Sequence, residues 1–302
     1  MKRRLFLQQS MLLGSGLAIS PSLLAAEQIP KDFEKLTILH TNDTHSNIET
    51  FSANHAKYPN QGGVARRSTL IEKIRRETDN VVLLDAGDIF QGTPYFNKFH
   101  GTLEMKLMSE MGYDCATLGN HDFDAGLDGL VNAMQYANFP IVCANYDFSN
   151  TPLKGMIQSY QIIKKGPFKV GVFGLGVRLQ GLVPQVYFGE TIHLNPFPIA
   201  SDMAQYLRFE EGCDLVICLS HLGYHAKQFK ECDTLLAKET ENIDLIIGGH
   251  THTFLDRPEV HKNSKGEKVL INQVGWAGLA LGKIDFYLGE RKRHKRHELV
   301  MV

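Results

Sequence analysis

The feature that most constrains this chain is a repeated succession of short apolar runs and segments with helical periodicity. The strand-like runs cover residues 36–40, 81–84, 114–118, 140–144, 169–175, 214–219, 243–247, 269–273 and 281–287. Helical spacing of apolar residues covers 64–76, 103–111, 127–137, 199–210 and 229–239. Strands that alternate with helices predict a layered α/β fold with both sheet faces covered. The neighbouring strand-like runs 160–163 and 169–175 predict hairpins and therefore mixed β-sheets.

Composition is typical of a soluble globular protein, with 43% hydrophobic and 22% charged residues. The formal net charge of −1 gives no electrostatic reason to expect nucleic acid as a partner. Five cysteines without a CxxC spacing argue against a disulfide framework or a zinc ribbon. We predict one α/β domain at about 30–290. The basic run in 291–302 predicts a solvated tail, with contact to an anionic surface or partner as the alternative.

Residues 1–26 have the features of an export signal. Arg3 and Arg4 precede an apolar run at 11–19 that is too short to span a bilayer. The adjacent arginines resemble a twin-arginine signal, which a receptor reads. We therefore expect a periplasmic or exported protein without a transmembrane domain in its mature form. Leu24 is a poor residue at the expected cleavage site, so an uncleaved membrane anchor is the alternative.

Polar motifs follow the first two strand-like runs. Asp43 and His45 are two residues apart, and an extended segment would place both side chains on one side. Gly87 permits a sharp turn that would bring Asp88 into a cleft, where a carboxylate can bridge two cations. Asp85, at the end of its strand, is interpreted as an orienting residue. Taken singly, these motifs could equally be solvent-facing turns or helix caps.

The third motif, residues 119–124, combines a ligand with two residues suited to act on a substrate. Asn120 offers a neutral oxygen ligand for a metal. His121 would face the opposite way and could meet the substrate. Asp124 could accept a hydrogen bond from the imidazole of His121, fixing its tautomer and favouring its charged form.

The last two motifs supply imidazoles. His221 follows the run 214–219, while His250 and His252 follow two glycines after the run 243–247. A single histidine at such a place is more often structural than a ligand. However, all five motifs end strands, and such ends meet at one edge of an α/β sheet. Nitrogen and oxygen ligands without a thiolate predict Zn²⁺, Mn²⁺ or Fe²⁺.

In this order the motifs resemble those of the calcineurin-like metallophosphoesterases, and within them the 5′-nucleotidase branch. The resemblance covers about 30–290 and implies a four-layer αββα sandwich, the metallo-dependent phosphatase fold. It implies two divalent metal ions (Zn, Mn or Fe). One ion would be held by Asp43, His45, Asp88 and His252, and the other by Asp88, Asn120, His221 and His250. It also implies that His121 and Asp124 form the catalytic dyad.

The resemblance further implies an exported enzyme that hydrolyses phosphomonoesters by a metal-bound hydroxide. Its partner would be a small phosphorylated substrate, expected to be a nucleotide. Exported 5′-nucleotidases usually continue into a second domain that binds the base, and this sequence ends at Val302. Two alternatives are therefore open. The chain could hydrolyse phosphodiesters such as 2′,3′-cyclic nucleotides or nucleotide sugars, or it could be a catalytic subunit working with a separate C-terminal nucleotidase-domain chain.

Overall fold

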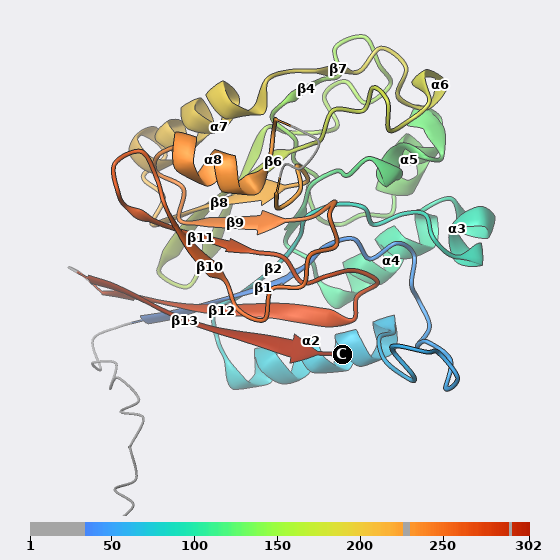
Figure 1. The fold of residues 1–302 in the computed structure, drawn as a ribbon, viewed down its shortest axis with the longest axis horizontal. Coiled ribbons are helices and arrows are strands. Elements are labelled where there is room, and N and C mark those ends of the chain that lie inside the picture. Colours follow the sequence, from blue (N-terminus) through green and yellow to red (C-terminus); the bar gives the residue numbers. More distant parts are fainter. Residues whose placement is uncertain (1–33, 226–229, 290–291) are drawn as a thin grey trace, which may run out of the picture. The chain divides into compact units, whose positions relative to one another are not determined.

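Two β-sheets packed face to face form the centre of the fold (Figure 1). The computed structural model describes residues 34–225, 230–289 and 292–302, and the predicted export signal at 1–26 lies outside them. The first sheet has the order β13-β12-β1-β2-β3. Its strands are β1 (Glu34–Thr41), β2 (Val81–Asp85), β3 (Cys115–Ala116), β12 (Ala280–Gly289) and β13 (Lys292–Met301).

The second sheet has the order β10-β11-β9-β8-β6-β5. Its strands are β5 (Tyr160–Lys165), β6 (Phe168–Leu175), β8 (Leu215–Ser220), β9 (Leu245–Gly248), β10 (Glu259–Lys262) and β11 (Lys268–Asn272). The four inner strands are parallel, and the edge strands β5 and β10 pair antiparallel to their neighbours. In the first sheet β1, β2 and β3 are parallel, and β12 pairs antiparallel with both of its neighbours, β1 and β13. The prediction of mixed sheets is therefore confirmed.

Helices cover the outer face of each sheet. The helices α2 (Val64–Glu77), α4 (Thr102–Met111) and α5 (Gly126–Met134) share a buried cluster with the first sheet. The helices α7 (Pro196–Gln205) and α8 (Asp233–Glu239) share another with the second sheet. A third buried cluster fills the space between the two sheets. The layers are therefore helix, sheet, sheet, helix, and the predicted four-layer αββα sandwich is confirmed.

Strand β8 shows why the apolar runs are continuous. Leu215, Ile217 and Leu219 point into the cluster between the sheets. Val216 and Cys218, on the alternate face, pack against the helices. Because successive side chains of a strand point to opposite faces, a strand between two covered faces needs apolar residues at every position.

The remaining elements are short. They are α3 (Pro94–Phe99), the 3₁₀ turn η1 (His121–Phe123), α6 (Gln185–Phe188), the π-helical turn η2 (Tyr206–Glu210), and the paired strands β4 (Tyr146–Asp147) and β7 (Ile192–His193). The apolar run 140–144, predicted as a strand, makes only the isolated bridges of Ile141 to Ala116 and Val142 to Gln158. A short apolar run is buried either as a strand or as a loop, and its periodicity does not distinguish them.

The prediction of a solvated tail at 291–302 differs from the structure. Residues 292–301 form β13, paired along its whole length with β12. The backbone N–H of Val302 donates to the Leu279 carbonyl, and the Val302 carbonyl accepts from Gly62. The density of positive charge alone predicts exposure and does not reveal a pairing partner. Edge strands tolerate lysine and arginine well, because charge there discourages pairing with other chains.

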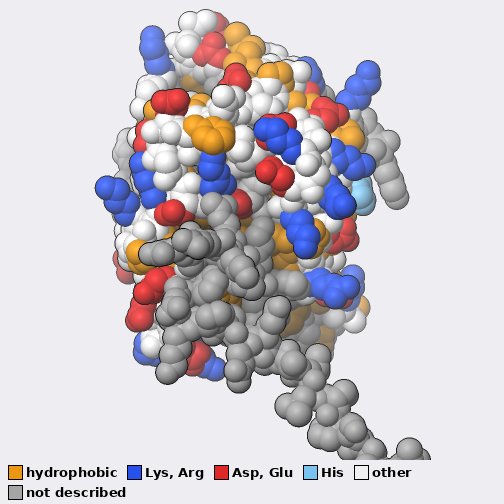
Figure 2. Space-filling view, turned by 90° about the vertical axis from the view of Figure 1, so that its left-hand side faces the viewer, with side chains coloured by type: hydrophobic (Ala, Val, Ile, Leu, Met, Phe, Trp, Pro, Cys, Tyr) orange, Lys and Arg blue, Asp and Glu red, His pale blue; other side chains and the backbone are white. Residues whose placement is uncertain are grey.

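The face of the molecule seen in Figure 2 carries basic and acidic side chains interspersed with one another. Within the described residues, none of the helices has both the length and the apolar character needed to cross a membrane.

Candidate metal centre

Five loops from the two sheets bring the predicted ligands together. Asp43 and His45 follow β1, Asp88 follows β2, and Asn120 lies beyond β3. From the second sheet, His221 follows β8, and the loop after β9 carries His250 and His252. The loops after β1 and β2 are joined by backbone hydrogen bonds, from Asp43 to the Gly87 carbonyl (2.9 Å) and from His45 to the Asp88 carbonyl (3.0 Å).

The ligand atoms fall into two adjoining groups. Asp43, His45 and His252 form one, and Asp88, His221 and His250 form the other; within each group the atoms lie within 4.8 Å of one another. Asp88 reaches both groups, because its Oδ2 lies 3.1 Å from His221 Nε2 and 3.8 Å from His45 Nε2. Its carboxylate thus has the position expected for a bridging ligand.

Hydrogen bonds at the far side of two imidazoles fix which nitrogen faces the centre. His221 Nδ1 lies 2.7 Å from the Ala86 carbonyl, and His45 Nδ1 lies 3.2 Å from the Phe90 carbonyl. A carbonyl oxygen only accepts, so each Nδ1 must carry the proton and donate it. In the neutral imidazole Nε2 then keeps its lone pair for a metal, the arrangement usual around metal-binding histidines.

Two buried atoms fit a metal. Asn120 Oδ1 forms no hydrogen bond among the described residues, and His221 Nε2 meets only the Asp88 carboxylate, whose Oδ2 is 3.1 Å away. A buried polar atom without a partner is costly, and a cation would satisfy both. His45 Nε2 and His252 Nε2 are also only 2.9 Å apart, so their lone pairs would repel unless a proton or a cation lay between them.

The electrostatic environment also favours cations. Burial lowers the pKa of His45 and brings that of His250 to about 4, so both are neutral at pH 7, as a ligand must be. Burial also opposes charge on His221, but the nearby Asp88 and Asp43 carboxylates outweigh it and raise its pKa to about 10. Positive charge is therefore strongly stabilised at this position, and a bound cation would replace that proton.

The backbone around the ligands is unusual. Five predicted ligands have a positive φ, between 48° and 70°: Asp43, His45, Asp88, His250 and His252. Residues other than glycine rarely adopt this conformation, and it clusters at functional sites where the surroundings enforce it. Gly119 is needed for a different reason, because a Cβ there would lie 2.1 Å from Asp88 Oδ1.

His121 and Asp124 lie beside the ligand groups. His121 Nδ1 is 2.7 Å from Asp124 Oδ2, and the hydrogen bond that His121 donates to Asp124 raises the pKa of His121. The backbone N–H of His121 donates to Asp88 Oδ1 (2.8 Å), and its ring lies 5.3 Å from that of His45. The His121 side chain is 38% exposed, so a substrate can reach it.

The structure adds positioning residues that the sequence argument missed. The buried carboxylate of Asp122 accepts hydrogen bonds from the backbone N–H groups of Asp88, Ile89, Phe90 and Gly119. It thereby joins the second and third motifs. Gln273 holds the His250–His252 loop, since its Oε1 accepts from Thr251 Oγ1 (3.1 Å) and its Nε2 donates to the Gly249 carbonyl. No local pattern in the sequence marks Gln273.

Asp85 and Asn42 support their neighbouring ligands. Asp85 accepts hydrogen bonds from Thr41 Oγ1 (2.5 Å) and the Gly87 backbone (2.9 Å), which agrees with the orienting role expected for it. Asn42 Nδ2 donates to Asp43 Oδ2 (2.6 Å), and its Oδ1 accepts from the Val274 backbone (2.9 Å). The loop that carries Asp43 and the loop that carries Asp88 are therefore each held by a residue close by in the sequence.

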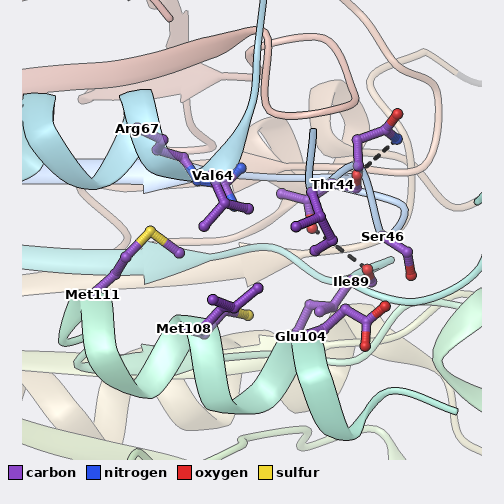
Figure 3. A pocket seen from close by; sticks show the side chains of 11 residues that line it. Thr44, Ser46, Val64, Arg67, Ile89, Glu104, Met108 and Met111 are labelled. Atoms are coloured by element: carbon purple, nitrogen blue, oxygen red, sulfur yellow. Dashed lines mark hydrogen bonds between the residues drawn. The ribbon is translucent and has the colours of Figure 1, made fainter. Parts of the chain in front are cut away.

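A small cavity lies beneath the loop that carries Asp43 and His45, between that loop, α2 and α4 (Figure 3). The cavity has room for roughly one water molecule, because the centre of a water-sized sphere can occupy about 10 Å³ of it. Four buried polar side chains line it: Thr44, Ser46, Arg67 and Glu104. Neither carboxylate oxygen of Glu104 has a hydrogen-bond partner among the described residues.

The chain is similar to known proteins in sequence and in fold. The calcineurin-like phosphoesterase family model matches residues 36–254. The trifunctional nucleotide phosphoesterase protein YfkN of Bacillus subtilis is 36% identical over 296 residues, which cover 87% of this chain and 19% of that protein. The 5′-nucleotidase of Bos taurus is 33% identical over 280 residues, covering 83% of this chain and 46% of that one. The chain thus spans less than half the length of these curated relatives.

Among solved structures, a 5′-nucleotidase precursor from Thermus thermophilus has a TM-score of 0.78 and 31% sequence identity. The match covers 89% of this chain and 55% of that one.

Proposed function

The chain belongs to the calcineurin-like phosphoesterase family, and we propose that it hydrolyses phosphomonoesters in the manner of a 5′-nucleotidase at a two-metal centre. The observation that carries the proposal is the adjacency of the two ligand groups, with Asp88 reaching both and the His121–Asp124 pair beside them. This arrangement suits in-line displacement at phosphorus, where charge must be neutralised on the oxygens around the reacting atom.

The proposed ligands divide between the two ions as the residues group in space. Asp43, His45 and His252 would hold one ion, while His221 and His250 would hold the other, with Asp88 shared. Asn120, whose buried Oδ1 has no partner among the described residues, would join the second ion. Two divalent ions would supply an activated water and neutralise phosphoryl charge. Zn²⁺, Mn²⁺ and Fe²⁺ suit this nitrogen and oxygen donor set.

We propose that His121 protonates the leaving group. Asp124 accepts the hydrogen bond from Nδ1, so the protonated imidazole presents its Nε2–H to the substrate. This proton can stabilise the departing oxygen and pass to it as the ester bond breaks. The backbone bond from His121 to Asp88 keeps the ring at a fixed place beside the ligands.

The test is a comparison of substrates on protein reconstituted separately with Mn²⁺, Zn²⁺ and Fe²⁺. We expect AMP to be hydrolysed to adenosine and phosphate, and bis-p-nitrophenyl phosphate to be a poor substrate. Activity should disappear on chelation and return with the metal. Metal-dependent turnover of the diester with none of AMP would reject the phosphomonoesterase proposal.

A second candidate is hydrolysis of cyclic nucleotides or nucleotide sugars. It is supported by the similarity to YfkN, whose name describes a trifunctional nucleotide phosphoesterase. Adding 2′,3′-cyclic AMP and a nucleotide sugar to the same panel distinguishes this candidate, because each product is separable from adenosine.

Two further proposals concern the setting of the enzyme. Export through a twin-arginine pathway is proposed from residues 1–26, and is tested by locating the chain with and without Arg3→Lys and Arg4→Lys. Action together with a separate nucleotidase-domain chain is the second of these proposals, and assay of the purified chain alone tests it. If the purified chain hydrolyses AMP alone at micromolar substrate, a partner is unnecessary.

A further inference from the structure

Five aromatic side chains form a connected cluster that begins at His252, a predicted metal ligand. The ring of Trp276 stacks on His252, with centroids 5.8 Å apart and planes inclined by 8°. Beyond it, the Phe51 ring lies 6.0 Å from both Trp276 and Tyr58, and 4.5 Å from His55. The members are Phe51, His55, Tyr58, Phe254 and Trp276, and we call them the aromatic platform.

The platform is built by the same loops that carry metal ligands. The loop after β1 carries Asp43 and His45 and then Phe51 and Tyr58, and the loop after β9 carries His252 and then Phe254. Trp276 lies in the loop after β11. Backbone hydrogen bonds join these loops: Ala277 donates to the Asp43 carbonyl (2.7 Å), and Gly275 donates to the Thr253 carbonyl (2.9 Å). The rings therefore hold a defined position relative to the metal centre.

The platform is partly open to solvent. Phe254 is 36% exposed, and the other four rings are half-buried. Surface hollows border it on two sides, one lined by residues 254–260 and the other by residues 47–52 with 93–95. Half-buried aromatic rings next to a reaction centre, rather than in a core, present apolar surface that a ligand can cover.

The platform also lies within reach of a substrate at the dyad. The His45 ring is 5.3 Å from that of His121 and 4.9 Å from that of His252, so it lies between them. Trp276 is the next ring beyond His252. A substrate whose phosphate lies over the ligands and whose leaving oxygen faces His121 can therefore extend toward the platform.

We propose that the aromatic platform binds the base of a nucleoside phosphate by stacking. The assignment rests on the proposed phosphoesterase function for the position of the phosphate. A nucleobase is the chemistry that fits, because it is planar and aromatic and can cover ring faces without a fixed hydrogen-bonding pattern. This catalytic chain would then select nucleotides with its own residues.

The first measurement uses the only tryptophan in the sequence, Trp276, as a reporter. Adenosine is titrated into the metal-free protein while Trp276 emission is recorded, with ribose as the non-aromatic control. We expect saturable quenching by adenosine and none by ribose. This readout needs neither metal nor turnover, so it is independent of the phosphoesterase proposal.

The second measurement compares AMP with ribose 5-phosphate on the metal-reconstituted enzyme. For Tyr58→Ala and Phe254→Ala we expect the ratio of kcat/KM for AMP over ribose 5-phosphate to fall about tenfold. That change corresponds to about 1.4 kcal/mol, within the range of one base–aromatic stacking contact. The conservative variants Tyr58→Phe and Phe254→Tyr should restore the ratio. Phe209→Ala is the matched control, because Phe209 is 67% exposed and outside the platform.

The outcomes separate the two proposals. Hydrolysis of both substrates with an unchanged ratio in the alanine variants would overturn the platform and leave the phosphoesterase proposal intact. Quenching by adenosine in a protein that hydrolyses neither substrate would support the platform and reject the phosphoesterase proposal. Self-association of the wild-type chain that Phe254→Ala abolishes, without quenching, would identify the surface as a contact between copies and overturn base binding.

Discussion

Single residues at the centre combine strained backbone with constrained side chains. Five predicted ligands adopt a positive φ, each at a cost of order 1–3 kcal/mol. The surroundings that hold them there include Asp122, which accepts four backbone hydrogen bonds, and Gln273, which holds the loop between His250 and His252. The strain places side chains from separate loops at one point, and it is maintained by buried hydrogen bonds around them.

His121→Ala is expected to lower kcat by about 10²–10⁴ while both metals stay bound, the usual contribution of a general acid. The reason is that the His121 ring lies outside both ligand groups while its backbone N–H bonds to Asp88. The backbone N–H survives the substitution. Turnover of AMP and metal content, measured by mass spectrometry on the same sample, check the prediction.

Asp124→Asn serves as the companion variant for His121→Ala. It keeps the size of the side chain but removes the charge that favours protonated His121, so kcat should fall with metal content unchanged. Undiminished turnover of a metal-replete His121→Ala protein would remove His121 from the mechanism.

At the residue scale, the sequence predicts those candidate ligands that lie in a short motif directly after a strand-like run. Asp43, His45 and the pair His250 and His252 stand out because their motifs all follow strand-like runs, so their joint occurrence indicates a site that no single motif would. The structure brings these residues together, and their roles as ligands stay predictions. Gln273 could not be found this way. It accepts a hydrogen bond from Thr251, which lies 22 residues away in the sequence, and no local pattern marks it.

Among the elements, β13 shows where sequence reasoning fails. A basic run predicts exposure, yet its pairing partner β12 is a strand whose apolar pattern was recognised at 281–287. Strand pairing is a non-local contact, so composition alone could not reveal it. The parallel inner strands were predictable for the opposite reason, because burial on both faces leaves a continuous apolar run.

Truncation after Gly289 is expected to lower the melting temperature and promote aggregation, because it removes β13 and leaves the edge of β12 unpaired. Thermal unfolding and light scattering of the truncated and full chains check this prediction. The matched control replaces the basic residues of 291–297 with glutamine in the full chain. If residues 290–302 were a solvated tail, truncation and control would both leave the melting temperature unchanged.

Helix α4 carries a buried carboxylate that lacks hydrogen-bond partners among the described residues. Glu104 is 3% exposed, and neither oxygen is hydrogen-bonded within the described residues. Glu104→Met, at a position next to Met105 and Met108, should raise the free energy of unfolding by about 1–3 kcal/mol, because it removes an unsatisfied buried group. Denaturant unfolding measures the change.

Glu110→Met provides the control on the same helix, because Glu110 is exposed and should change stability by less than about 0.5 kcal/mol. A loss of stability in Glu104→Met would instead show that a bound water or ion in the cavity satisfies the carboxylate.

On the scale of the whole molecule, the candidate metal centre lies where loops from the two sheets meet. Loops from the first sheet carry Asp43, His45 and Asp88, and loops from the second carry His221, His250 and His252. Each proposed ion would have ligands from both sheets, so metal binding should stabilise the packing of one sheet on the other. The layered α/β class could be predicted from the alternation of apolar runs and helical segments, whereas the four-layer arrangement was predicted from the resemblance that these motifs carry.

Removing the metals should therefore lower the stability of the entire unit and not only its activity. Binding at 100 times Kd stabilises the folded state by about 2.7 kcal/mol per site, which for a chain of this size raises the melting temperature by roughly 5 °C or more. The effect should weaken as pH falls, because protons compete with metal for the imidazoles. Calorimetry with chelator and with added Mn²⁺ or Zn²⁺ measures it. Asp88→Asn, which weakens the ligand shared by both groups, should largely lose the response. If the melting temperature of the wild-type chain did not change when metal was added or removed, a metal centre that joins the sheets would be contradicted.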